Sequence, residues 1–158
     1  MSICPNHQTG RTSPFSTRAD IAQLGATGYE LDTTVFTDED RKAVKEQIDE
    51  YKYCQDLILD GDLYRIESPF ETNNFTEAVV SKDKSKAILV YYRRLGSVNN
   101  EISRIRMKGL NPDKKYFVKE LNSAFYGETL MNVGICVSFD WAEGDFATRK
   151  YHFEEVKS

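Results

Sequence analysis

The spacing of apolar residues changes once along this chain, near residue 61, and this change limits the folds that it can adopt. Before it, apolar residues recur at helical intervals, which predicts a helix with one buried stripe. After it, apolar and polar residues alternate in short runs separated by turn residues, as in strands. We therefore expect an α+β chain, with a helical part in residues 1–60 and a strand part in residues 61–158. The stripe consists of Val44, Ile48, Tyr51, Cys54 and Ile58.

The helical part is predicted to contain a helix, a short strand and a second helix. Ser13 is a capping residue followed by proline, so the first helix should begin there and run to about residue 24. Apolar residues alternate with acids in Tyr29–Asp32, which predicts a strand. Thr37 should cap the second helix and Gly61 should end it. These elements cannot close a core alone, but they match the end of a TIM-type (β/α)₈ barrel.

The strand part is predicted to hold about seven or eight short strands, which favours an antiparallel β-sandwich. Two turns stand out: Lys82–Ser85, and the segment Asn111-Pro112-Asp113, where proline presets the backbone. The predicted strands are Leu63–Ile66, Phe75–Val80, Ala87–Tyr92, Ile102–Lys108, Tyr116–Leu121, Cys136–Phe139 and Thr148–Phe153.

Charge and cysteine content exclude several classes of function. The formal net charge is −4, so no basic surface for nucleic acid or an anionic membrane is expected. No apolar run approaches the roughly 20 residues of a membrane span, and no signal-peptide pattern is visible. The three cysteines are far apart, which favours a reducing cytoplasm. His7 and His152 are too distant in sequence for a metal-binding motif, so we expect no metal and no cofactor.

Two polar segments of the helical part could carry chemistry. Asn6–Arg11 could be a βα loop near a sugar site, or a plain polar loop before a helix; its composition alone favours the plain loop. Glu30 and Asp32 would lie about 7 Å apart on one face of a strand, as two glycosidase carboxylates could. Acids are common at strand ends for other reasons, so we do not assign these two as catalytic.

Aromatic residues offer two candidate sugar contacts in the strand part. Tyr91-Tyr92-Arg93-Arg94 could stack on a sugar, although such a segment is more typical of a core strand with a solvated edge. Trp141 is the single tryptophan and could be a sugar platform; a loop residue that covers the sandwich is the favoured interpretation.

Several blocks in register resemble glycoside hydrolase family 36 α-galactosidases over essentially the whole chain. Pro5–Arg11, Thr17-Arg18 and Gly28–Asp32 resemble the last two βα units of the catalytic barrel of that family. The segments Val44–Ile48 and Tyr51-Lys52 are similar to its final barrel helix. The blocks that resemble its C-terminal β-sandwich are Gly61–Arg65, Ser68–Phe70, Val90–Arg93, Lys108–Asp113 and Leu130–Gly134.

The resemblance implies a remnant of the barrel in residues 1–60 and a C-terminal antiparallel β-sandwich in residues 61–158. The family is retaining, and its two catalytic aspartates both precede the block Pro5–Arg11. Their motifs are absent here, so we assign no catalytic, cofactor-binding or metal-binding residue to this chain. We expect an inactive piece of an α-galactosidase for melibiose- or raffinose-like sugars, which forms a homo-oligomer and binds α-galactoside only when complete. The alternative is a stand-alone, non-catalytic carbohydrate-binding or interaction module.

Overall fold

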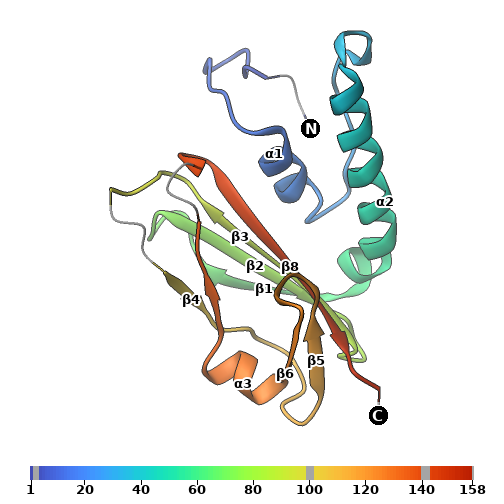
Figure 1. Ribbon diagram of the computed structural model, residues 1–158, viewed down its shortest axis with the longest axis vertical. Helices are drawn as coiled ribbons and strands as arrows, with labels where there is room; N and C mark the ends of the chain where they lie inside the picture. The colour runs from blue at the N-terminus through green and yellow to red at the C-terminus, as the bar shows by residue number, and fades with distance from the viewer. Residues whose placement is uncertain (2–3, 99–101, 140–142, 158) are drawn as a thin grey trace.

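In the computed structural model, which describes residues 1, 4–98, 102–139 and 143–157, helices come first and strands follow (Figure 1). The helical part contains α1 (Phe15–Ala22), the 3₁₀ helix η1 (Thr33–Val35) and α2 (Asp38–Asp60). The elements that follow are β1 (Asp62–Glu67), β2 (Asn74–Val80), β3 (Lys86–Arg93), β4 (Ser103–Ile105), β5 (Lys115–Val118), η2 (Lys119–Leu121), β6 (Ser123–Tyr126), α3 (Gly127–Asn132), β7 (Ile135–Val137) and β8 (Ala147–Glu155).

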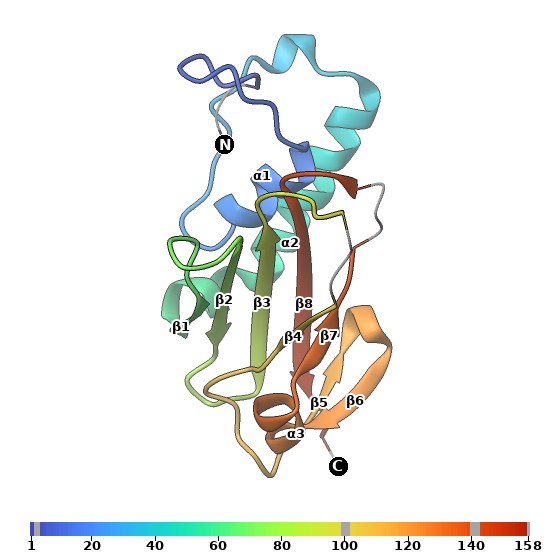
Figure 2. The same ribbon diagram turned by 90° about the vertical axis from the view of Figure 1, so that its left-hand side faces the viewer.

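Six strands form one antiparallel sheet in the order β1-β2-β3-β8-β5-β6, and β4 pairs with β7 in a second, small sheet (Figure 2). The strand β8 lies between β3 and β5, so that Tyr151 is opposite Leu89 and Phe153 is opposite Val118. The predicted antiparallel sandwich is therefore confirmed, although its two layers differ greatly in size.

The large sheet uses its two faces for different partners, as the alternation of side chains along each strand requires. On one face, Leu89, Tyr116 and Phe153 pack against β4, β7 and α3 in the main apolar core. On the opposite face lie α1 and α2 (Figure 1). There, Val79 and Ile88 contact a short apolar segment of α2 in a second, smaller cluster, so the helical part is joined to the sheet by few apolar residues.

The ends of α2 follow the sequence signals. Thr37 Oγ1 accepts a hydrogen bond from the Asp40 amide at 3.1 Å, and Asp40 Oδ2 accepts one from the Thr37 amide at 3.0 Å, which forms a capping box. Gly61 is the C-cap residue of the helix, and a side chain does not fit there because a Cβ would lie 2.4 Å from the carbonyl oxygen of Leu57 and 2.6 Å from Val79 Cγ1. Among the described residues, no helix has the length and apolar character needed to cross a bilayer.

Two predictions for the helical part are wrong. Ser13 does not cap α1: Pro14 is the N-cap residue, in an extended conformation and without a side-chain cap, and the helix begins at Phe15. Tyr29–Asp32 forms no strand ladder, because within the described residues only Met1 lies beside it with backbone hydrogen bonds.

The stripe on α2 is buried at one point only, because the helix leaves the sheet toward its N-terminus (Figure 1). Cys54 is 3% exposed, as predicted for a core residue, whereas Ile48 is 36% exposed. The contact with the sheet is made around Cys54, together with Leu57 and Ile58.

In the strand part, the sequence did not reveal β6 or α3, and two predicted strands are shorter than expected. Ile102–Lys108 contributes only the three residues of β4. The strand predicted at Tyr116–Leu121 ends at Val118, and after η2 the chain turns at Asn122, which has a φ of 46°. Gly127 then starts α3 against the backbone of Asn111, where a Cβ would lie 2.0 Å from the carbonyl oxygen.

Candidate functional site

Two segments of the helical part run side by side in the manner of parallel strands. The amide of Glu30 donates to the carbonyl oxygen of Met1 at 2.8 Å, and the amino group of Met1 donates to the carbonyl oxygen of Gly28. Met1 thus bonds to Gly28 and Glu30, the residues on either side of Tyr29, and this is the hydrogen-bond pattern of a parallel pair.

The loop Asn6–Arg11 holds its shape through its own hydrogen bonds. Asn6 Oδ1 accepts from the amides of Gln8 and Thr9, each at 3.0 Å, and the Asn6 amide donates to the carbonyl oxygen of Arg11 at 2.9 Å. The remaining polar side chains, including His7 and Gln8, are exposed. The loop thus presents fixed polar groups to solvent. This agrees with both interpretations, a sugar-facing loop and a plain polar loop before a helix.

Of the pair Glu30 and Asp32, the aspartate has a local structural role. Asp32 Oδ1 accepts hydrogen bonds from the amide of Thr34 at 2.9 Å and from its hydroxyl at 2.6 Å, which caps η1. The Thr34 side chain and then its amide lower the pKa of Asp32. In this structure the Asp32 carboxylate is engaged in capping η1.

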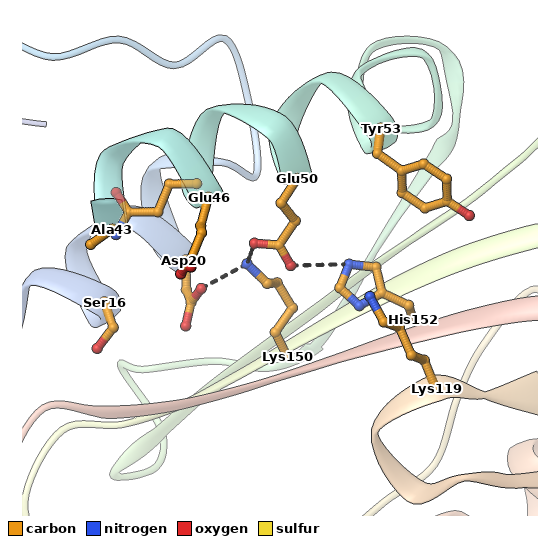
Figure 3. Close-up of a pocket in the computed structure, with 10 residues that line it drawn as sticks. Ser16, Asp20, Ala43, Glu46, Glu50, Tyr53, Lys119, Lys150 and His152 are labelled. Carbon is orange, nitrogen blue, oxygen red and sulfur yellow. Dashed lines mark hydrogen bonds and ion pairs between the residues drawn. The ribbon is translucent and has the colours of Figure 1, made fainter. Parts of the chain in front are cut away.

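The strongest concentration of charge lies in a cleft of about 610 Å³ between α1, α2 and β8 (Figure 3). Lys150 Nζ of β8 lies 2.8 Å from Asp20 Oδ1 of α1 and 2.6 Å from Glu50 Oε2 of α2, and it also donates to Gln23 Oε1 at 3.0 Å. Burial by itself would lower the pKa of Lys150, but Asp20 and Glu50 raise it above its ordinary value. The lysine side chain is only 11% exposed, so it is a buried, fully paired cation.

His152 extends the same cluster along β8. Its Nδ1 lies 2.6 Å from Glu120 Oε1, and its amide donates to Glu120 Oε2 at 2.8 Å. Its Nε2 lies 3.4 Å from Glu50 Oε1, within ion-pair distance (Figure 3). Burial by itself would lower the pKa of His152, but Cys54 and Glu120 raise it to about 9. Burial likewise would raise the pKa of Glu120, and the hydrogen bonds from His152 lower it instead.

The chemistry of this cluster is ion pairing between helices and sheet. Each cation of β8 is matched by a carboxylate, and the pKa of Glu120 is lowered, which is the opposite of what a general acid requires. Sequence reasoning did not find these contacts. The available signal was the polar series Thr148, Lys150 and His152, which occupies every second position of a central strand and therefore shares one face.

The other candidate residues do not come together in one site, and one of them lies outside the residues that the structure describes. Tyr91 is a core residue that stacks on Phe139 at 5.6 Å, and the guanidinium of Arg93 lies 4.3 Å from the centre of the Phe139 ring. This agrees with the core interpretation of Tyr91–Arg94. Trp141 lies outside the described residues. His7 and His152 belong to different sites, and nowhere in the described ranges do three histidine, cysteine or acidic side chains gather as metal ligands.

Comparison with known proteins identifies the family. Residues 76–153 match the glycosyl hydrolase family 36 C-terminal domain, and residues 1–61 match melibiase. The chain belongs to glycoside hydrolase family 36. The resemblance to its C-terminal part is thus confirmed, and so is the fold of a barrel end followed by a β domain.

The family members that match this chain are much longer than it is. The α-galactosidase AgaA of Geobacillus stearothermophilus is 34% identical over 99% of this chain, which spans only 21% of AgaA. The crystal structure of AgaB from the same organism superposes with a TM-score of 0.94 at 35% identity, covering 99% of this chain and 21% of AgaB. An AgaA variant in complex with raffinose has a TM-score of 0.94 at 34% identity, over 98% of this chain and 21% of that one.

Proposed function

We propose that this chain is the C-terminal part of an α-galactosidase that, when complete, hydrolyses terminal α-galactosides such as melibiose and raffinose with retention. The observation that carries this proposal is the likeness of the whole chain, with a TM-score of 0.94, to α-galactosidase structures. The AgaA variant with bound raffinose supports the substrate class. In such an enzyme, one carboxylate attacks the anomeric carbon while a second protonates the leaving oxygen.

The role we assign to this chain within the enzyme is structural. Residues 1–60 would supply the last βα units, and residues 61–158 the sandwich that supports them. The loop Asn6–Arg11 lies at the far end of α1 from the large sheet (Figure 1). Since barrel sites are built from βα loops, the sandwich would stand away from the sugar and act by holding α1 and α2.

The first test is activity of the purified chain alone. We expect no hydrolysis of an aryl α-galactoside, because the aspartate nucleophile and acid of the family are not present in this sequence. The chain is expressed in a host without its own α-galactosidase. Release of the aryl alcohol by the purified chain is then followed by absorbance. Turnover that follows the protein through purification would contradict the structural role.

A chimera tests the proposal more directly. The segment of AgaA that aligns with this chain is replaced by residues 1–158, and hydrolysis of raffinose is compared with that by intact AgaA. We expect a folded, active chimera, whereas AgaA that merely lacks the segment should be inactive. A chimera that folds but cannot hydrolyse raffinose, together with binding of free galactose by the isolated chain, would instead favour a stand-alone carbohydrate-binding module.

We also infer a cytoplasmic, homo-oligomeric enzyme of carbohydrate metabolism. The thiols of Cys4, Cys54 and Cys136 are all free, which suits a reducing compartment. An apolar groove of about 500 Å³ lies between α1 and the sheet, and it is lined in part by Ile21, Phe75 and Tyr92. Uncovered apolar surface of this kind promotes association, so light scattering should show dimers or larger species of the isolated chain. A monomer at all concentrations would contradict this.

A further inference from the structure

The carboxylate of Glu50 is shared between two cations that lie on the same face of β8 (Figure 3). One oxygen contacts Lys150 and the other faces His152. Each cation has a further carboxylate from a different element: Asp20 of α1 for Lys150, and Glu120 of η2 for His152. These five residues, which we call the charged joint, link both helices to the sandwich.

Other contacts also hold the helices on this face: the Tyr53 hydroxyl of α2 donates to Glu154 of β8, and Ala19 of α1 is buried. Besides its pairing with Lys150, Asp20 accepts a hydrogen bond from the Thr148 hydroxyl at 2.6 Å, and Thr17 of α1 donates to the carbonyl oxygen of Phe146 at 2.6 Å. The apolar contact of α2 is confined to the turn around Cys54. The charged joint is the part of this attachment in which ionisable groups of both helices pair with cations of β8.

We propose that the charged joint is a pH-dependent lock, which holds α1 and α2 on the sheet while its groups are charged and loosens them when His152 becomes neutral. The physical reason is burial. His152 is 8% exposed and lies against two carboxylates, so loss of its proton removes the cation that both Glu50 and Glu120 face. Loss of the proton from His152 would leave Lys150 as the one remaining cation of the charged joint beside Glu50. Glu120 would lose the cation that it faces.

The pH range follows from the direction of each shift. The folded pKa of His152, about 9, exceeds the ordinary value of 6.5, so its stabilising contribution is complete below pH 6.5 and is lost as the pH rises through about 9. The pKa of Glu120 is lowered, so its contribution is present above its ordinary value of 4.5 and is lost on acidification. The titratable or charged groups near His152 are Glu50, Tyr53 and Cys54 of α2, Lys119 and Glu120 of η2, and Lys150 and Glu154 of β8.

Hydrogen exchange of the full chain tests the lock without any activity assay, so it is independent of the proposed function. Protection factors for the amides of α1 and α2 are compared with those of β3 in the same sample, at pH 7 and pH 10. We expect the helices to lose at least about 10-fold protection at pH 10 while β3 stays protected, because local opening need not involve the core strands.

Two variants and a matched control sharpen the result. His152→Gln should loosen the helices already at pH 7 and remove their additional loss at pH 10, and Glu50→Gln should also loosen them at pH 7. Glu46→Gln, one turn away and 4.0 Å from its lysine partner, should behave like the unmodified chain. If His152→Gln keeps the pH dependence, or if the helices of the unmodified chain stay protected at pH 10, the proposal is overturned. Protected β3 amides show that a variant is folded.

Discussion

The strand part and the helical part of this chain differ in where their apolar residues find partners. In the strand part, Leu89, Tyr116 and Phe153 are enclosed between two layers that both belong to the same segment. In the helical part, only Cys54 and Ala19 are buried apolar residues among those described, while Val35 and Ile48 remain exposed. The comparison shows that the strand part has its own apolar core. The helical part buries few apolar residues and depends on the strand part for that burial.

The largest expected effect is a loss of core packing in the strand part. Leu89→Ala should lower the free energy of unfolding by about 2–5 kcal/mol, because Leu89 is fully enclosed and the cavity cannot close. Leu59→Ala on α2 removes the same atoms from a side chain that is 55% exposed, so it should change stability by less than about 0.5 kcal/mol. Chemical denaturation of both variants measures the difference. Equal losses would show that the two parts share one core.

Two truncations test whether the strand part folds alone. A chain that starts at residue 36 keeps α2, and one that starts at residue 61 loses the contacts of Cys54, Leu57 and Ile58 with Val79 and Ile88. We expect both to unfold cooperatively, with the shorter chain less stable by about 2–4 kcal/mol, as a few half-buried side chains would contribute.

Thermal unfolding followed by circular dichroism provides the measurement for these truncations. Absence of any β signal in the shorter chain would mean that α2 belongs to the folding nucleus and that the boundary near residue 61 is wrong. Failure of both chains to fold would mean that residues 1–35 matter more than their sparse contacts indicate.

The smallest expected effect compares two glycines. Gly109 has a φ of 78°, and a Cβ there would lie 2.3 Å from the ring of Tyr64. Gly109→Ala should therefore cost about 1–3 kcal/mol. Gly25 in the helical part has open space around it, so Gly25→Ala should be neutral or should stabilise by up to about 1 kcal/mol. The melting temperatures of the two variants measure these changes in stability. A clear loss of stability in Gly25→Ala would reveal constraints on the helical part that its contacts do not show.

Sequence patterns predicted the elements whose signals are local. Apolar runs in β2 and β3 match their burial on both faces of the sheet, and Thr37 with Asp40 specifies the start of α2 through atoms three residues apart. The exposed fraction of Ile48 could not be predicted in this way, because it depends on the angle at which α2 crosses the sheet.

Other features depend on contacts between distant segments. α3 has six residues, too few for a helical period, and it starts where Gly127 meets Asn111. Tyr29–Asp32 has the alternation of a strand, but a strand also needs hydrogen-bonded neighbours. The pairing of Lys150 with Asp20 and Glu50 joins residues 100 or more positions apart, so it could not be predicted from local patterns.

The central position of β8 has a consequence for the order of events during synthesis. The ribosome synthesises β8 after the seven other strands described here. Until β8 is inserted between them, β3 and β5 do not belong to one sheet. Thr148 and Lys150 of β8 also hold α1, and Lys150 holds α2, so these polar contacts of the helices form only after β8 is in place. Ribosomes add about 5–20 residues per second, so for several seconds the nascent chain carries an unpaired β3 edge, and chaperones have most to protect in that interval.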